Sequence, residues 1–204
     1  MVKEEKTGAK AVIIVLIAVF ILIIAGAVYV QKVKLSKVLF EYNGFQVKRE
    51  VDKSGNLYSI QLYLNENSEP STISVRNDPR NLEDIPVEYG LREKVLKSEA
   101  FVTMEPNASG LTVVAAIEIS KIIGNEFLYA VPTKGALLWD VGTGAPVKDC
   151  KDADDDTAII KLVKGNQTAV YSENECVIVE GKTQSEIIES ADRLILTLLG
   201  IMKE

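Results

Sequence analysis

The hydropathy pattern of the chain is dominated by one uncharged apolar run, from Ala11 to Val30. A helix needs about 20 apolar residues to cross the hydrocarbon core of a bilayer. The sequence therefore predicts a transmembrane helix over residues 11–31 that contacts membrane lipid. A cytoplasmic tail over 1–10 would precede it, and a juxtamembrane stalk over 32–38 and an extracytoplasmic domain over 39–204 would follow.

The orientation of this segment is not decided by its flanking charges. Three lysines precede the run and three follow it, so the positive-inside rule nearly ties. Because long domains after a span translocate largely regardless of charge, we expect a single-pass protein of the cell membrane with its N-terminus inside. In the alternative interpretation, Ala25-Gly26-Ala27 is a signal cleavage site and the domain is secreted. A pilin-like start is disfavoured, since Ile13 stands where an acidic residue is expected.

The first part of the domain, residues 39–90, has the alternation of apolar and polar residues that is typical of strands. Apolar and polar residues alternate in three segments, LFEYNGF, 47–51 and LYSIQLYL, and the turn signals Asn-Gly and Ser-Gly-Asn lie between them. Prolines at Asp78-Pro79 and Pro86 then interrupt regular structure. We therefore expect a β-rich first half built from hairpins.

The second part, residues 95–204, alternates strand and helix patterns. A strand at Ala100–Met104, a helix at Leu111–Ile123 and a strand at Phe127–Val131 give the βαβ unit of a parallel sheet. Further strands are predicted at 158–163, 168–171 and 176–179, the first two paired as a hairpin.

The C-terminal segment carries the clearest local signature of the chain. Thr183 and Glu186 have the spacing of a capping box, which begins a helix. One face of that helix is apolar, formed by Ile187, Ala191, Leu194, Ile195, Leu198 and Met202. Such a face must pack on a sheet, and Gly200 is placed to end the helix. The predicted fold class is α/β, with α+β as the alternative, in one mixed domain.

Composition narrows the function classes. The chain has a net charge of −6 and no histidine. An acidic domain without a basic stripe argues against nucleic acid as a partner. The missing histidine removes the commonest general base and most catalytic zinc sites. We therefore expect no enzymatic activity and no cofactor.

Cys150 and Cys176 are the only cysteines, and an even pair in an exterior domain predicts one disulfide. The alternative is two buried free thiols. Asn107 and Asn166 begin the sequons Asn-Ala-Ser and Asn-Gln-Thr on predicted loops, so both are candidate glycosylation sites. Trp139, the only tryptophan, is interpreted as a core anchor, with an exposed partner contact as the alternative.

The densest group of carboxylates follows Cys150. Asp152, Asp154 and Asp156 have the 1, 3, 5 spacing of a calcium loop, but the glycine and glutamate of that motif are replaced by Thr157 and Val163. These three are weak metal candidates, and a solvated acidic loop is the alternative. Asp192-Arg193, in the last helix, is interpreted as a surface or supporting ion pair rather than a catalytic one.

Three segments resemble a known group of proteins. The segments are NDPRNLEDIPVE (77–88), FVTMEPN with the helix after it, and CVIVEGKTQSEIIESADRLILTLLGIM (176–202). They resemble small archaeal single-pass membrane-anchored proteins that are known mainly from genome sequence. The ending CVIVEG…ADRLILTLLG also resembles the α/β modules of archaeal surface-layer proteins. The resemblance implies an archaeal cell surface, but no activity.

The expected function is a non-enzymatic binding or structural role in the cell envelope, with an envelope or membrane protein as partner. One alternative is a carboxylate-dependent enzyme that acts on a surface glycan or peptide, which would need two carboxylates in one cleft. The other is a module that binds an ion or a small solute.

Overall fold

The computed structural model describes residues 15–26, 39–52, 55–63 and 71–204. The chain divides into two units, Met1–Leu39 and Phe40–Glu204, and each is described by itself. In the first unit, residues 15–26 form a helix with exposed side chains. No helix in the described ranges is both long and apolar enough to span a membrane. The remainder of the predicted span, the tail and the stalk lie outside the described residues.

The second unit begins with an antiparallel four-stranded sheet. Its strands, in the order in which they lie side by side, are β1 (Leu39–Tyr42), β2 (Phe45–Asp52), β3 (Gly55–Leu62) and β4 (Ser71–Val75). Asn43 and Gly44 link β1 to β2 with φ angles of 49° and 86°. This two-residue turn needs left-handed backbone at both positions, which is why Asn-Gly suits it. The predicted β-rich first half is confirmed.

A second sheet of five strands follows. Its strands are β5 (Glu99–Met104), β6 (Thr133–Leu137), β7 (Thr157–Lys164), β8 (Ala169–Glu173) and β9 (Cys176–Gly181). They lie in the order β6-β5-β7-β9-β8, and only β8 is antiparallel to its neighbour. Among the central strands, β9 is buried along its whole length, β5 at every position after Glu99 and β7 at half of its positions, as expected for inner strands of a mainly parallel sheet.

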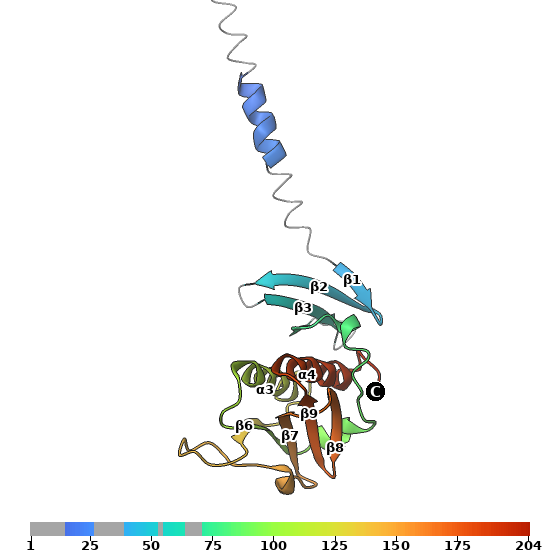
Figure 1. Cartoon of the computed structure of the whole chain (residues 1–204). Helices are drawn as coiled ribbons and strands as arrows, with labels where there is room; N and C mark the ends of the chain where they lie inside the picture. The colour runs from blue at the N-terminus through green and yellow to red at the C-terminus, as the bar shows by residue number, and fades with distance from the viewer. Residues whose placement is uncertain (1–14, 27–38, 53–54, 64–70) are drawn as a thin grey trace, which may run out of the picture. The chain divides into compact units, whose positions relative to one another are not determined.

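The helices are α2 (Leu91–Val95), α3 (Gly110–Ile123) and α4 (Gln184–Leu198), with 3₁₀ turns η1 (Pro79–Asn81) and η2 (Cys150–Asp152). Figure 1 shows α3 and α4 lying between the two sheets, and one hydrophobic core joins all three layers. The mixed α/β class and the docked C-terminal helix are therefore confirmed.

Both ends of α4 are stabilised as the sequence predicts. The amide of Glu186 donates to Thr183 Oγ1 (3.2 Å), and the amide of Thr183 donates to Glu186 Oε2 (3.0 Å), which completes the capping box. Gly200 has a φ of 70°, and the amide of Ile201 donates to the carbonyl of Leu196 (2.9 Å). This left-handed glycine with its returning hydrogen bond is a Schellman end.

The βαβ prediction is right in its topology and wrong in its second strand. β5, α3 and β6 form the unit, with β5 and β6 parallel, but β6 begins at Thr133. The predicted strand Phe127–Val131 is instead a turn, in which the amides of Leu128 and two following residues donate to the carbonyl of Asn125. These apolar residues reverse the chain at the end of α3 before it can rejoin the sheet.

The predicted hairpin of 158–163 with 168–171 is also wrong. β9 lies between β7 and β8, and β8 pairs with β9. β9 is buried along its whole length, whereas Tyr171 and the two residues after it in β8 are only partly buried or exposed. The more apolar strand therefore takes the central place, and β8 takes the edge.

Trp139 is not a core anchor. Its side chain is 46% exposed, in the loop that follows β6. Val147 in the same loop forms an isolated bridge to Leu137, so this loop returns along the outer edge of the sheet rather than under it.

Candidate functional sites

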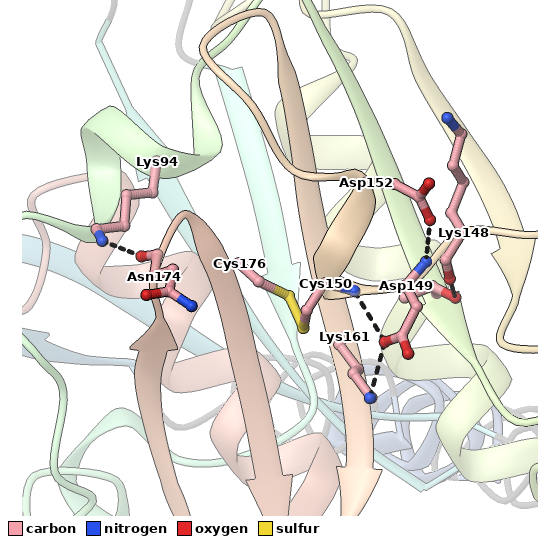
Figure 2. Close-up of a disulfide and its surroundings, with 9 residues drawn as sticks. Lys94, Lys148, Asp149, Cys150, Asp152, Lys161, Asn174 and Cys176 are labelled. Atoms are coloured by element: carbon pink, nitrogen blue, oxygen red, sulfur yellow. Dashed lines mark hydrogen bonds and ion pairs between the residues drawn. A yellow bond between two sulfur atoms is a disulfide. The ribbon is translucent and has the colours of Figure 1, made fainter.

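The first site region is the disulfide and the loop that it fastens. Cys150, in η2, is bonded to Cys176, in β9, as predicted (Figure 2). Cys176 has no exposed surface and packs with Phe101, Ile159 and Ile178 on the sheet face that looks away from α3 and α4. The bond therefore holds the acidic loop against that face, which no described helix of the core covers.

Two of the three candidate aspartates accept hydrogen bonds from the loop itself, and the third, Asp156, accepts from Ser98 Oγ (3.2 Å). Asp152 accepts from the amide of Asp149 (2.8 Å), and Asp154 accepts from the amides of Asp156 (2.9 Å) and Thr157 (2.7 Å). These amides hold the pKa of Asp154 below its usual value. Among the described residues, no three His, Cys, Asp or Glu side chains are gathered as a metal site. The candidate metal ligands do not share a common point.

Asp149 connects the loop to the sheet. Its Oδ1 accepts from Lys161 Nζ (2.8 Å) and from the amide of Cys150 (2.8 Å), as Figure 2 shows. The hydrogen bond from Lys161, with that from the backbone, lowers the pKa of Asp149. This ion pair and the disulfide are adjacent, so together they fix the start of η2.

The two sequons lie on exposed loops, where an oligosaccharide can be accommodated. Asn107 precedes α3, and Ser109 of its sequon caps that helix. Asn166 follows β7. Its backbone N–H donates to Glu180 Oε1 (2.6 Å), and the hydroxyl of Thr168, in the same sequon, donates to Glu186 Oε2 (2.9 Å). Glycosylation of both sites stays a prediction.

A crevice of about 200 Å³ lies between the Asn107 loop, the end of β7 and the start of α4. It is at the carboxyl ends of β5 and β7, where ligands bind in many α/β sheets, and its wall includes Glu105, Lys164 and Gln184. One first-turn amide of each nearby helix is capped, that of Thr112 in α3 by Ser109 Oγ and that of Glu186 in α4 by Thr183 Oγ1.

Two ionisable side chains, those of Asp192 and Arg193, are buried in α4. Asp192 has no exposed surface, and its Oδ2 accepts from the amides of Arg76 (3.0 Å) and Asn77 (2.9 Å) and from Asn77 Nδ2 (2.9 Å). Arg193 is 6% exposed and donates to the carbonyls of Ile85 (3.2 Å) and Lys203 (2.7 Å). The interpretation of Asp192-Arg193 as a surface pair is wrong, because α4 is buried all round from Ser190 to Leu198 and the two side chains have different partners.

A second carboxyl group, that of Glu118 in α3, accompanies Asp192. Glu118 accepts from Arg76 Nε at 2.7 Å, while its Oε2 and Asp192 Oδ1 are buried without a hydrogen-bond partner among the described residues. Burial raises the pKa of Asp192 to about 7, and the nearby negative charge of Glu118 acts in the same direction. Burial also raises the pKa of Glu118. The cluster therefore retains a proton into the neutral pH range.

A cavity of about 470 Å³ between β4 and α3 reaches this cluster. Arg76 and Glu118 line it together with Ser74 and Lys121, whereas Asp192 lies behind them without exposure. Only one of the two carboxyl groups can therefore meet a molecule in the cavity. Sequence reasoning missed this cluster, because its members are far apart in the chain and the helical spacing of α4 marks only one apolar face.

No family model, curated protein or solved structure matches this chain. The resemblance to small archaeal anchored proteins therefore stays an expectation. What the described residues define is a class of structure, a disulfide-bonded α/β domain with a helical layer between two sheets.

Proposed function

We propose that the chain is a single-pass, membrane-anchored protein whose α/β domain lies outside the cell and binds another component of the envelope. The observation that carries this proposal is the pairing of the only two cysteines. Disulfides persist in oxidising compartments and are rare in the cytosol of most cells. The apolar run from Ala11 to Val30 supports the anchor, because its length matches the bilayer core.

A binding role is supported over catalysis by the chemistry of the buried carboxyls. A carboxylate-dependent hydrolase needs two carboxyl groups that both reach the substrate. Of the pair Glu118 and Asp192, only Glu118 borders a cavity, and Asp192 is held by three donors. The chain also has no histidine to act as a base.

The topology is tested with a membrane-impermeant, amine-reactive biotin reagent on intact cells, followed by peptide mass spectrometry. We expect exposed domain lysines such as Lys151 and Lys182 to be labelled in intact cells. Lys3, Lys6 and Lys10 should be labelled only after lysis, so the chain contains its own control. Labelling of these three in intact cells, with Lys182 protected, would show the opposite orientation. Loss of the whole N-terminal peptide would show a cleaved signal.

The binding role is tested by chemical crosslinking on intact cells, with purification of the epitope-tagged chain under denaturing conditions. We expect one or a few envelope components to be recovered reproducibly with the chain. A variant in which residues 39–204 are replaced by an unrelated folded domain on the same anchor is the control for neighbours in the membrane. Recovery of the same components with both proteins, or of the chain alone, would contradict the proposal.

A further inference from the structure

One flank of the five-stranded sheet exposes apolar side chains beside an open strand edge. In α3, Val113 is 39% exposed and Ile117 is 47% exposed, one helical turn apart. The opposite side of α3, with Ala115 and Ile119, is fully buried in the core. An amphipathic helix is expected to turn its apolar side chains toward the core, yet Val113 and Ile117 stay partly exposed among the described residues.

The strand next to this flank, β6, is the edge of the sheet, and its hydrogen bonds show which groups point outward. The amide of Ala100 donates to Pro132 (2.9 Å), and that of Leu138 donates to Met104 (3.0 Å). In a parallel pair this register directs Lys134 and Ala136 toward β5, and Thr133, Gly135 and Leu137 toward the outer edge.

Part of the outer edge is already paired within the chain. The amide of Leu137 donates to Pro146 (2.8 Å), and its carbonyl accepts from Lys148 (3.0 Å). No described strand pairs with the outward groups of Thr133 and Gly135. An open length of two outward residues therefore remains, beside the exposed side of α3.

A groove of about 460 Å³ lies between this open edge and α3, and most of its wall is apolar. Its lining includes Met104, Val113, Ala116, Ile117, Thr133 and Gly135. Gly135 has no positive φ, and a Cβ there would meet open space. Its backbone conformation thus does not require glycine, and glycine inside a strand marks a place where another chain can approach closely.

We infer that this groove, bounded by α3 and β6, takes an extended segment of a partner protein. The segment adds as a short strand beside Thr133 and Gly135 and places an apolar side chain against Ile117, over Gly135. This mode of recognition combines main-chain hydrogen bonds with a pocket for alternate side chains. Lys121 lies in the groove wall, so the segment also carries an acidic residue. The inference rests on the proposed binding role and names its surface.

A second copy of this chain is a poorer occupant. Antiparallel pairing of β6 with itself about Gly135 would set Thr133 of each copy opposite Leu137 of the other. The outward groups of Leu137 are already bonded to Pro146 and Lys148. Such a pair would also bring two copies of Lys121 to one junction.

The test uses the full chain in detergent micelles and a phage library of random heptapeptides. We expect the enriched peptides to alternate apolar residues and to include an acidic one. A fluorescent synthetic copy of the best peptide should bind about tenfold more weakly to Ile117→Glu and to Gly135→Val, as for central contacts of an interface. Leu111→Glu is the matched control, because Leu111 is 46% exposed on the same helix but does not line the groove.

Hydrogen exchange gives an independent measurement on the wild-type protein. Bound peptide should slow exchange of the amides of Thr133 and Gly135, and leave that of Leu137 nearly unchanged, since it is already bonded. The inference is overturned if no alternating peptide is enriched, if Leu111→Glu weakens binding as much as Ile117→Glu, or if protection appears elsewhere. Dimerisation of the chain that Gly135→Val abolishes would assign the groove to a second copy instead. Binding to purified protein does not depend on membrane orientation, so failure here is separable from failure of the lysine-labelling test.

Discussion

At the scale of single residues, Asp192 is an ionisable side chain with no exposed surface. The folded protein holds its pKa at about 7, against an ordinary value of 3.8. Between these two values the folded state keeps a proton that the unfolded state has released. Stability therefore falls as pH rises through this window, and the loss is complete above the folded pKa.

We predict that Asp192→Asn flattens this pH dependence. Asparagine keeps an oxygen for the donors from Arg76 and Asn77 but carries no charge to desolvate. From pH 4 to pH 8 the wild-type free energy of unfolding should fall by at most about 4 kcal/mol through this group, and that of the variant by clearly less. Urea unfolding at several pH values measures both. Asp155→Asn, at an exposed carboxyl, should keep the wild-type profile.

Some residue roles can be predicted from the sequence, whereas roles that depend on contacts between distant parts of the chain cannot. The disulfide of Cys150 with Cys176 was predictable, since no other cysteine competes for either thiol. The role of Asp192 was not, because its donor Asn77 is 115 residues away in the chain. The apolar spacing of α4 reports the helix but not that a second sheet covers its other side.

At the scale of elements, the end of β9 and the first turn of α4 lie in close backbone contact at Gly181. A Cβ on Gly181 would lie 2.3 Å from the amide nitrogen of Ile187. Backbone cannot move aside as a flexible side chain can, so strand and helix would have to separate. The glycine at this strand end is therefore required by packing, not by its φ angle.

We predict that Gly181→Ala destabilises the domain by about 1–3 kcal/mol, the usual cost of overpacking a close contact. The urea midpoint should fall while the far-ultraviolet circular dichroism of the folded state stays close to that of the wild type. Gly110→Ala is the control, because a Cβ at Gly110 meets open space in the first turn of α3. An equal loss in both variants would mean that the contact with Ile187 is not the cause.

Local sequence signals predicted most individual helices and strands, but they did not predict which strands pair with each other. The capping box at Thr183 located the start of α4, and Asn43-Gly44 located the first hairpin turn. The order β7-β9-β8 in the sheet depends on which strands are buried most deeply. The spacing of the strands along the chain does not predict this order. FLYAV has the composition of a strand, but it lies where the chain must turn back from α3.

At the scale of the whole molecule, the two faces of the five-stranded sheet are stabilised by different means. One face packs against α3 and α4 in the large core, while the other carries a small cluster around Phe101 and Ile159. Five buried residues form that small cluster, and the disulfide crosses it. A covalent link is therefore most useful on the face where apolar burial is least.

We predict that removing this link with Cys150→Ser and Cys176→Ser lowers the free energy of unfolding by about 3–4 kcal/mol. The bond spans 26 residues, and in the loop-closure model it removes that much entropy from the unfolded chain. The small cluster should loosen first, so amides of the acidic loop should exchange faster than those of α4. Urea unfolding with and without reductant measures the effect, and the double variant is the control because reductant cannot change it further. If reduced wild-type protein, with both thiols titrated, unfolds at the same urea concentration as the oxidised form, the apolar contacts alone hold this face.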